Sequence, residues 1–170
     1  MTVDPSPATS LVLGPEEGES VQIGGLGVRF MVDENESGGG FSLVEHPIAP
    51  RALAAPMHVH EREDEYSFIL EGRVGVQIGD VVRVAGPGDL VFKPRAIWHA
   101  FWNAGDEPAR LLEIISPAGF ERYFRDLAPL FPPQAPDPDF AGIAEVQARY
   151  GLTVDFGSVE RLVAEHNLVM

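Results

Sequence analysis

The sequence predicts an all-β core followed by a short helical extension. Through the middle of the chain, short apolar runs end in turn residues at intervals of about 8–12 residues, as in antiparallel sandwiches and barrels. After Ser116 and Pro117 the apolar residues recur at helical spacing instead. A chain of 170 residues, of which 45% are hydrophobic, is ordinary for one soluble domain with its own core. We therefore expect one β-barrel or sandwich that carries helices at its C-terminal end.

Three segments of different composition divide the chain. Residues 1–19 are rich in Pro, Ser, Gly and Glu and predict a flexible N-terminal arm. Residues 20–116 hold the predicted barrel, and residues 117–170 hold helices packed against it. The spacer D-E-N-E-S-G-G-G at 33–40 predicts a flexible loop between two strands. The runs typical of strands cover residues 20–23, 28–32, 41–45, 66–70, 74–78, 81–84, 90–92, 98–102 and 110–115.

Three short helices are expected in the extension. Apolar residues at helical spacing cover residues 120–127, 143–150 and 159–166. Ser158 is a candidate N-cap for the last helix, and Gly151 is a C-terminal signal for the helix before it. The Pro-rich residues 132–138 predict a linker between helices.

Charge and composition exclude several kinds of function. The formal net charge is −14, and no cluster of Lys and Arg is present to bind a phosphate backbone, so we expect no nucleic acid partner. The chain has no Cys, so neither a disulfide nor a Cys-rich structural zinc site is expected. It has neither a basic, apolar leader nor an uninterrupted apolar run of about eighteen residues, so we expect no membrane association and a cytoplasmic location.

Two segments concentrate the residues that bind transition metals. In the first, His58, His60 and Glu65 follow the spacing H-x-H-x4-E, and in the second His99 comes from a separate predicted strand. Side chains alternate along a strand, so His58 and His60 face the same way, roughly 6.6 Å apart. Glu65 lies an odd number of residues beyond His60, so a turn must separate them, and a hairpin would bring Glu65 in on a neighbouring strand. Three imidazoles and one carboxylate can hold a transition metal with positions left open for chemistry.

Nearby titratable residues have simpler interpretations. Without a metal, the four candidate ligands would be hydrogen-bonded barrel histidines and a surface carboxylate. Glu61, Glu63 and Asp64 are interpreted as a solvated turn rather than as extra ligands. His46 and His166 have no comparable neighbours in the sequence and are expected to be surface or ordinary packing histidines.

The two metal-binding segments resemble the two sequence motifs of the cupin superfamily. The first motif reads G-x5-H-x-H-x3/4-E-x6-G, and residues 52–72 match it except that Ala52 stands where the leading Gly is usual. The second motif reads G-x5-P-x-G-x2-H-x3-N. Residues 88–103 match it except that Ala96 replaces the inner Gly, which puts a positive φ at that position in question. The resemblance spans about residues 40–116.

The resemblance implies a fold, a ligand set and a class of function. The fold is a small double-stranded β-helix barrel of jelly-roll type, and the implied metal ligands are His58, His60, Glu65 and His99. A single cupin with a helical extension also resembles small bacterial quercetin dioxygenase-like proteins. We therefore expect a metal-dependent oxidoreductase of dioxygenase type that acts on a small organic substrate inside the barrel.

One divalent metal ion per chain is expected, and mixed nitrogen and oxygen ligands suit Fe, Mn, Ni, Co, Cu and Zn alike. Glu65 is also the expected catalytic residue, because a carboxylate with labile ligation can take a proton from a bound hydroxyl group.

Two other classes of function remain open. A redox-neutral cupin, such as an isomerase or decarboxylase, would use the same ion as a Lewis acid without O2. A non-catalytic cupin would bind a small molecule without converting it. No DNA-binding helix-turn-helix precedes the barrel in the sequence, which disfavours a regulator that binds DNA.

Strand parity predicts the pocket and the outer surface. Residues that share parity with Glu65 or His99 face the interior, so Ser67, Ile69 and Phe101 are the candidate substrate-binding walls. The same rule sends four aromatic residues to the outer face: Tyr66, Phe68, Trp98 and Trp102. Helices or a second subunit must cover such a patch, so we expect a homodimer.

Overall fold

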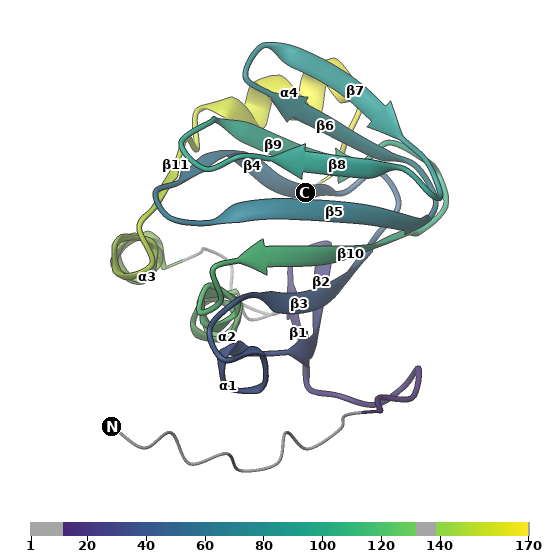
Figure 1. The fold of residues 1–170 in the computed structure, drawn as a ribbon. Helices are drawn as coiled ribbons and strands as arrows, with labels where there is room; N and C mark the ends of the chain where they lie inside the picture. Colours follow the sequence, from purple (N-terminus) through teal and green to yellow (C-terminus); the bar gives the residue numbers. More distant parts are fainter. Residues whose placement is uncertain (1–11, 132–138, 170) are drawn as a thin grey trace, which may run out of the picture.

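The strands form two antiparallel sheets whose inner faces share one core (Figure 1). This computed structural model describes residues 12–131 and 139–169. One sheet has six strands, in the order β1 (Ser20–Ile23), β2 (Leu26–Val32), β3 (Ser42–Ile48), β10 (Ala109–Ser116), β5 (Asp64–Glu71) and β8 (Leu90–Lys93). The other has five, in the order β11 (Leu152–Val154), β4 (Leu53–His60), β9 (His99–Asn103), β6 (Val74–Ile78) and β7 (Val81–Ala85). The prediction of an all-β core with short helices is confirmed.

Alternation along the strands places the hydrophobic core between the two sheets. In β10, Leu111 and Ile115 are fully buried, whereas Ile114 is exposed on the opposite face. Leu111 pairs in register with Ile69 of β5, which is also fully buried. Burying an aliphatic side chain of this size contributes about 1.5–3 kcal/mol to stability. The apolar faces of both sheets therefore hold the barrel closed.

Helices cover two different parts of the barrel. They are α2 (Glu121–Leu127), the 3-10 helix η1 (Ala128–Leu130), α3 (Phe140–Arg149) and α4 (Ser158–His166). α2 and α3 lie together at one end of the strands, and α4 packs on the outer face of the five-stranded sheet (Figure 1). There Leu162 is fully buried, and His166 stacks on Trp102 with ring centroids 4.1 Å apart. In the described part of the chain, no helix has the length and apolarity needed to cross a membrane.

A short strand inside the extension was not predicted. Gly151, at φ 64°, follows α3, and the chain then turns back to form β11. β11 pairs with β4, so that Leu152 lies opposite His60 and Val154 lies opposite His58. The extension thus adds an edge strand to the strand that carries two of the candidate ligands.

The spacer at 33–40, predicted as a flexible loop, begins with a helical turn, α1 (Glu34–Ser37). The Asp33 side chain accepts hydrogen bonds from the backbone N–H groups of Asn35 and Glu36. In return, the Glu36 side chain accepts a hydrogen bond from the backbone N–H of Asp33. This reciprocal capping box gives the first half of the spacer a fixed conformation, so the prediction of a loop there is wrong.

The described end of the N-terminal arm lies against β2. Arg29 donates hydrogen bonds to the backbone carbonyl of Gly14, at 2.6 Å, and to that of Glu17, at 2.8 Å. The flexibility predicted for residues 1–11 and the linker predicted at 132–138 lie outside the described residues.

Candidate functional site

Two sheets bring the four candidate ligands together. His58 and His60 lie at the end of β4, and His99 begins β9, in register with His58. Glu65 lies near the start of β5, in the other sheet. The turn predicted between His60 and Glu65 is present, but the predicted hairpin is wrong, because β5 pairs with β8 and β10 and not with β4. The turn instead crosses from one sheet to the other, so Glu65 meets the histidines across the barrel interior.

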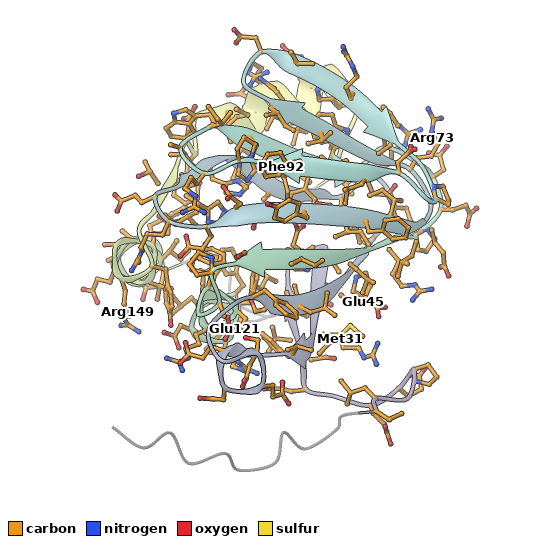
Figure 2. All side chains as sticks on the ribbon, viewed as in Figure 1. Met31, Glu45, Arg73, Phe92, Glu121 and Arg149 are labelled. Carbon is orange, nitrogen blue, oxygen red and sulfur yellow. The ribbon has the colours of Figure 1, made fainter. Side chains whose placement is uncertain are left out.

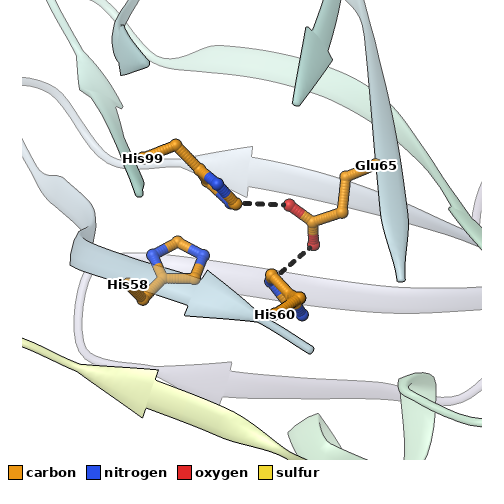
Figure 3. A group of neighbouring side chains, drawn as sticks. All are labelled: His58, His60, Glu65 and His99. Carbon is orange, nitrogen blue, oxygen red and sulfur yellow. Dashed lines mark hydrogen bonds and ion pairs between the residues drawn. The ribbon is translucent and has the colours of Figure 1, made fainter. Parts of the chain in front are cut away.

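The four side chains form a compact buried cluster (Figure 3). One ligand atom from each of His58, His60, Glu65 and His99 lies within 4.8 Å of the others. His99 Nε2 lies 3.2 Å from one Glu65 oxygen, and His60 Nε2 lies 3.5 Å from the other. Donor atoms bound about 2.0–2.2 Å from one ion lie roughly 3–4 Å apart. The cluster therefore has the dimensions to hold one metal ion.

Backbone carbonyls fix the protonation of two imidazoles. His58 Nδ1 lies 2.8 Å from the Pro56 carbonyl oxygen, and His99 Nδ1 lies 2.9 Å from that of Ile97. A carbonyl oxygen can only accept a hydrogen bond, so each Nδ1 carries the proton. Burial lowers the pKa of both His58 and His99, which keeps the rings neutral. Their Nε2 atoms then carry no proton and each presents a lone pair, as metal coordination requires.

Two features of the cluster favour a bound cation. The Nε2 lone pair of His99 faces a carboxylate oxygen of Glu65, a repulsive contact that a cation between them would make attractive. Both ring nitrogens of His60 are buried and make no hydrogen bond within the described residues. A buried polar atom left without a partner costs about 1–3 kcal/mol. The donor set thus fits a metal ion better than it fits a hydrogen-bonded core.

A buried lysine connects the cluster to a second glutamate. Lys93 Nζ lies 2.9 Å from Glu65 and 3.0 Å from Glu113, and the Ser67 hydroxyl donates to Glu113 at 2.8 Å. Burial alone would raise the pKa of Glu65, but the positive charge of Lys93 outweighs it and holds that pKa well below its usual range. For Glu113 burial dominates and raises the pKa to about 7. One carboxyl group beside the cavity is therefore ionised, while the other can give or take a proton near neutral pH.

Glu63, interpreted from the sequence as part of a solvated turn, is buried instead. Its Oε2 lies 3.6 Å from His60 Nδ1 and has no hydrogen-bond partner among the residues described. Glu61 is exposed, and Asp64 forms an ion pair with Arg95 at 2.7 Å. Both residues therefore fit the interpretation of a solvated turn. Glu63 shares parity with Glu65, which was the available signal that it faces inward. A carboxylate behind a metal-binding imidazole commonly orients that ring.

The backbone before His99 is also tied to the cluster. Ala96 has φ 61°, so the left-handed conformation that the motif usually assigns to Gly is kept despite the added Cβ. Its N–H donates to the His60 carbonyl at 2.8 Å. The substitution at this position therefore leaves the local loop in place.

A largely apolar cavity of about 420 Å³ extends from the cluster to the C-terminal helices. His58, His60 and Glu65 line one part of it. Phe120 packs edge-on against His60, with ring centroids 4.4 Å apart. About half of the remaining wall comes from the extension and includes Tyr123, Phe124, Leu127, Ile143 and Leu152. The extension thus closes the barrel over the candidate metal site.

The predicted pocket walls lie in different places. Phe101 lines the cavity, whereas Ser67 and Ile69 are buried in β5 but are not among the residues that line it. His46, which has no metal-like context in the sequence, lines the cavity as well. The helical spacing in residues 120–127 predicted packing on the barrel but gave no sign that these side chains would close over a cavity.

Comparison with known proteins agrees with this geometry. Residues 45–115 match the family model of the cupin domain. No curated protein sequence matches the chain. KdgF from Halomonas sp. superposes with a TM-score of 0.59 and 17% identity, over 67% of this chain and 99% of that one. A predicted oxalate decarboxylase from Thermotoga maritima gives a TM-score of 0.59 and 17% identity, over 63% of this chain and 99% of that one.

The polyketide cyclase RemF from Streptomyces resistomycificus is similar as well, with a TM-score of 0.56 and 23% identity, over 64% of this chain and 80% of that one. Identities this low show that the fold is shared, but they do not show that the reaction is shared. The matched model shows a cupin domain at residues 45–115, and the fold shared with these solved structures agrees with it.

Proposed function

We propose that this protein is a metal-dependent oxidoreductase of dioxygenase type that acts on a small organic substrate in the barrel. The observation that carries the proposal is a cluster of three imidazoles and one carboxylate, three members of which line a cavity of about 420 Å³. Pockets of this size are typical of small-molecule sites. A transition metal held by His58, His60, Glu65 and His99 would supply Lewis-acid and redox chemistry, with two positions of an octahedral ion left for other molecules.

The chain's own residues supply the remaining parts of the proposed reaction. Glu65 is ionised and would accept a proton from a substrate hydroxyl group. Lys93, held between Glu65 and Glu113, would stabilise the negative charge on that side of the site. The apolar walls from the extension offer water few hydrogen-bond partners, and surroundings of low polarity strengthen charge interactions inside the cavity. The ligand types do not select among Fe, Mn, Ni, Co, Cu and Zn.

A second candidate is a redox-neutral enzyme, such as an isomerase, a decarboxylase or a cyclase. It is favoured by Glu113, a carboxyl group that lines the cavity and is hydrogen-bonded to Lys93 and Ser67, since acid–base chemistry there needs no O2. Two proteins of similar fold are described as a predicted oxalate decarboxylase and a polyketide cyclase. A third candidate is a cupin that binds a small molecule without converting it.

Oxygen uptake separates these candidates. Protein reconstituted in turn with Fe, Mn, Ni, Co, Cu and Zn is screened for O2 consumption with phenolic and keto-acid substrates. The dioxygenase proposal predicts uptake that requires both metal and substrate and that is lost in Glu65→Gln. Substrate conversion without O2 uptake would select the redox-neutral candidate. Substrate binding without conversion, with each of the six metals, would select the cupin that binds a small molecule without converting it.

We further propose that the protein is a cytoplasmic homodimer. Phe68, Leu90, Phe92 and Ile114 are exposed on the outer face formed by β10, β5 and β8, and Figure 2 shows Phe92 on the outward side of β8. The chain carries a net charge of −14, so an uncharged patch is where two copies can meet with least repulsion. Of the other aromatic residues predicted to face outward, Trp98 is exposed, whereas α4 covers Trp102.

A further inference from the structure

The polar composition of the cavity wall restricts the ligands that it can hold. Neither Lys nor Arg occurs among the described residues that line the cavity, so away from the candidate metal cluster a ligand carboxylate or phosphate would find no cationic side chain. Most of the wall is aliphatic or aromatic, with Phe101, Phe120 and Phe124 among the rings. A sugar would leave most of its hydroxyl groups without partners, at a cost for each one. Uncharged, mainly aromatic compounds fit this wall.

Most polar groups on the wall already have partners. Glu113 accepts hydrogen bonds from Ser67 and Lys93, and Gln147 is hydrogen-bonded to Tyr123. His58, His60 and Glu65 belong to the candidate metal cluster. Apart from that cluster, His46 is a titratable side chain on the described wall with a ring nitrogen for which no hydrogen bond is found.

The ring nitrogen in question is His46 Nε2. The ring is almost completely buried on β3, and its Nδ1 lies 2.9 Å from the Gly27 carbonyl oxygen. Because that carbonyl can only accept, Nδ1 carries the proton and donates. Burial lowers the pKa of His46 to about 4, so the ring is neutral and Nε2 is a hydrogen-bond acceptor near neutral pH. No hydrogen bond of Nε2 is found within the described residues.

His46 lies apart from the candidate metal cluster. It is on β3, which β10 separates from the β5 strand that carries Glu65. Its ring packs against two residues that also line the cavity, with centroids 5.3 Å from Phe124 and 6.2 Å from Phe101. The cavity therefore has a second polar position, set among aromatic rings.

We infer that His46 is a specificity-determining residue, and that the cavity takes uncharged aromatic compounds with a hydroxyl group that donates a hydrogen bond to His46 Nε2. This inference rests on the proposed function only in placing the substrate in the same cavity. An acceptor fixed in an apolar pocket selects strongly for ligands that carry the matching donor, since other ligands leave it unpaired. The aromatic neighbours hold the ligand ring, and His46 sets its orientation.

The test compares 2-naphthol with 2-methoxynaphthalene, two uncharged fluorescent compounds of similar shape that differ in the hydroxyl donor. Binding to the full-length, metal-loaded protein is measured by fluorescence titration. We expect wild type to bind 2-naphthol about 5–10-fold more tightly, the size of one net hydrogen bond. His46→Leu should bind both compounds equally, and His46→Gln, which restores an acceptor, should recover part of the preference. Thermal unfolding checks that each variant is folded.

The same titrations in His58→Ala/His99→Ala separate His46 from the metal. Our inference predicts that this variant keeps the preference for 2-naphthol. A preference that disappears there, or that persists in His46→Leu, would assign the hydroxyl group to another partner and overturn the inference. Equal binding of the two compounds by wild type, or no binding of either, would overturn it as well. Failure to bind metal or to consume O2 would leave these affinities unchanged, so the two proposals fail separately.

Discussion

At the scale of single residues, Glu63 places a second carboxylate behind the histidine cluster. Its side chain and that of His60 are both buried, each has atoms without hydrogen-bond partners in the described chain, and the two meet at 3.6 Å. A metal ion on His60 Nε2 would leave Nδ1 to carry the proton, facing the Glu63 carboxylate. We therefore expect Glu63 to orient His60 and to raise its basicity towards the metal.

Replacement of Glu63 tests this role. Glu63→Gln should lower the affinity for Zn²⁺ or Co²⁺ by about 10–100-fold, as loss of such outer partners usually does. Glu61→Gln is the matched control, because it removes the same charge from an exposed position two residues away. Affinity is measured by competition with a chromophoric chelator. Equal affinities in the two variants would show that Glu63 does not act on the metal site.

His46 should make stability depend on pH. Its pKa in the folded protein is about 4, against an ordinary value of 6.5, so the unfolded chain binds a proton over a pH range in which the folded chain does not. The stabilisation is complete above pH 6.5 and is lost as the pH falls towards 4. The shift corresponds to about 3 kcal/mol.

The difference between wild type and His46→Leu isolates this contribution, because the other titrating groups are common to both proteins. In urea unfolding of metal-depleted protein, the stability of wild type relative to the variant should fall as the pH is lowered from 6.5 to 4. A pH-independent difference would mean that His46 takes up a proton in the folded protein as readily as in the unfolded one.

The sequence identified the ligand cluster but missed residues that depend on non-local packing. The spacing of His58, His60 and Glu65 reflects local alternation and a turn, both of which are visible in the sequence. His46 becomes a cavity residue only because α2 and α3 fold back over the barrel from positions far along the chain. Ser67 and Ile69 have the parity of the interior, but parity alone does not distinguish the core from the cavity wall.

At the scale of elements, β11 links the extension to the ligand-bearing strand. Leu152 of β11 is buried opposite His60 and also lines the cavity, whereas the neighbouring Thr153 is exposed. The strand thus contributes on one side to the core and on the other only to the surface. It gives β4 a partner on the edge that β9 leaves free.

Substitutions in β11 should separate these two sides. Leu152→Ala removes buried apolar contacts and should cost about 2–4 kcal/mol of unfolding free energy. Thr153→Ala, in the same strand, should change it by less than about 0.5 kcal/mol. Both values come from urea unfolding of the full chain. Similar, small losses in the two variants would indicate that β11 is only loosely attached to β4.

Element boundaries were predictable where one strand face is apolar and turns are marked by Gly or Pro. Residues 74–78 were predicted in full and form β6, and the three predicted helices are present. α1 was missed because the glycines of its spacer outweighed the D-x-x-E capping signal. β11 was missed because three residues are too few to show a period. The position of β5 in the opposite sheet from β4 could not be predicted, because it depends on pairing with strands far away in the sequence.

At the scale of the whole molecule, the outer face of β10, β5 and β8 is the expected dimer interface. Phe68 lies opposite Leu90 in register, and Tyr66 stacks on Phe92 with ring centroids 4.8 Å apart. β8 is also the edge strand of its sheet, so backbone pairing can extend the contact. The face combines exposed aromatic rings with an open strand edge.

Sedimentation of the purified protein should give the mass of a dimer. A Phe68→Glu/Phe92→Glu variant should sediment as a monomer, because each subunit would place two charges in an apolar contact. Val12→Glu, at an exposed position in the arm, should remain dimeric. A wild-type monomer at all concentrations tested would refute the proposed dimer.

Binding of one metal ion by His58, His60, Glu65 and His99 underlies the proposed function. Elemental analysis of purified, metal-reconstituted protein should find about one transition metal ion per chain, since one such cluster is present in the described residues. His58→Ala/His99→Ala should bind almost none, whereas His166→Ala, which alters a histidine outside the cluster, should retain the ion. If wild type carries no more metal than His58→Ala/His99→Ala, these four residues do not form a metal site and the proposed enzyme has no catalytic ion.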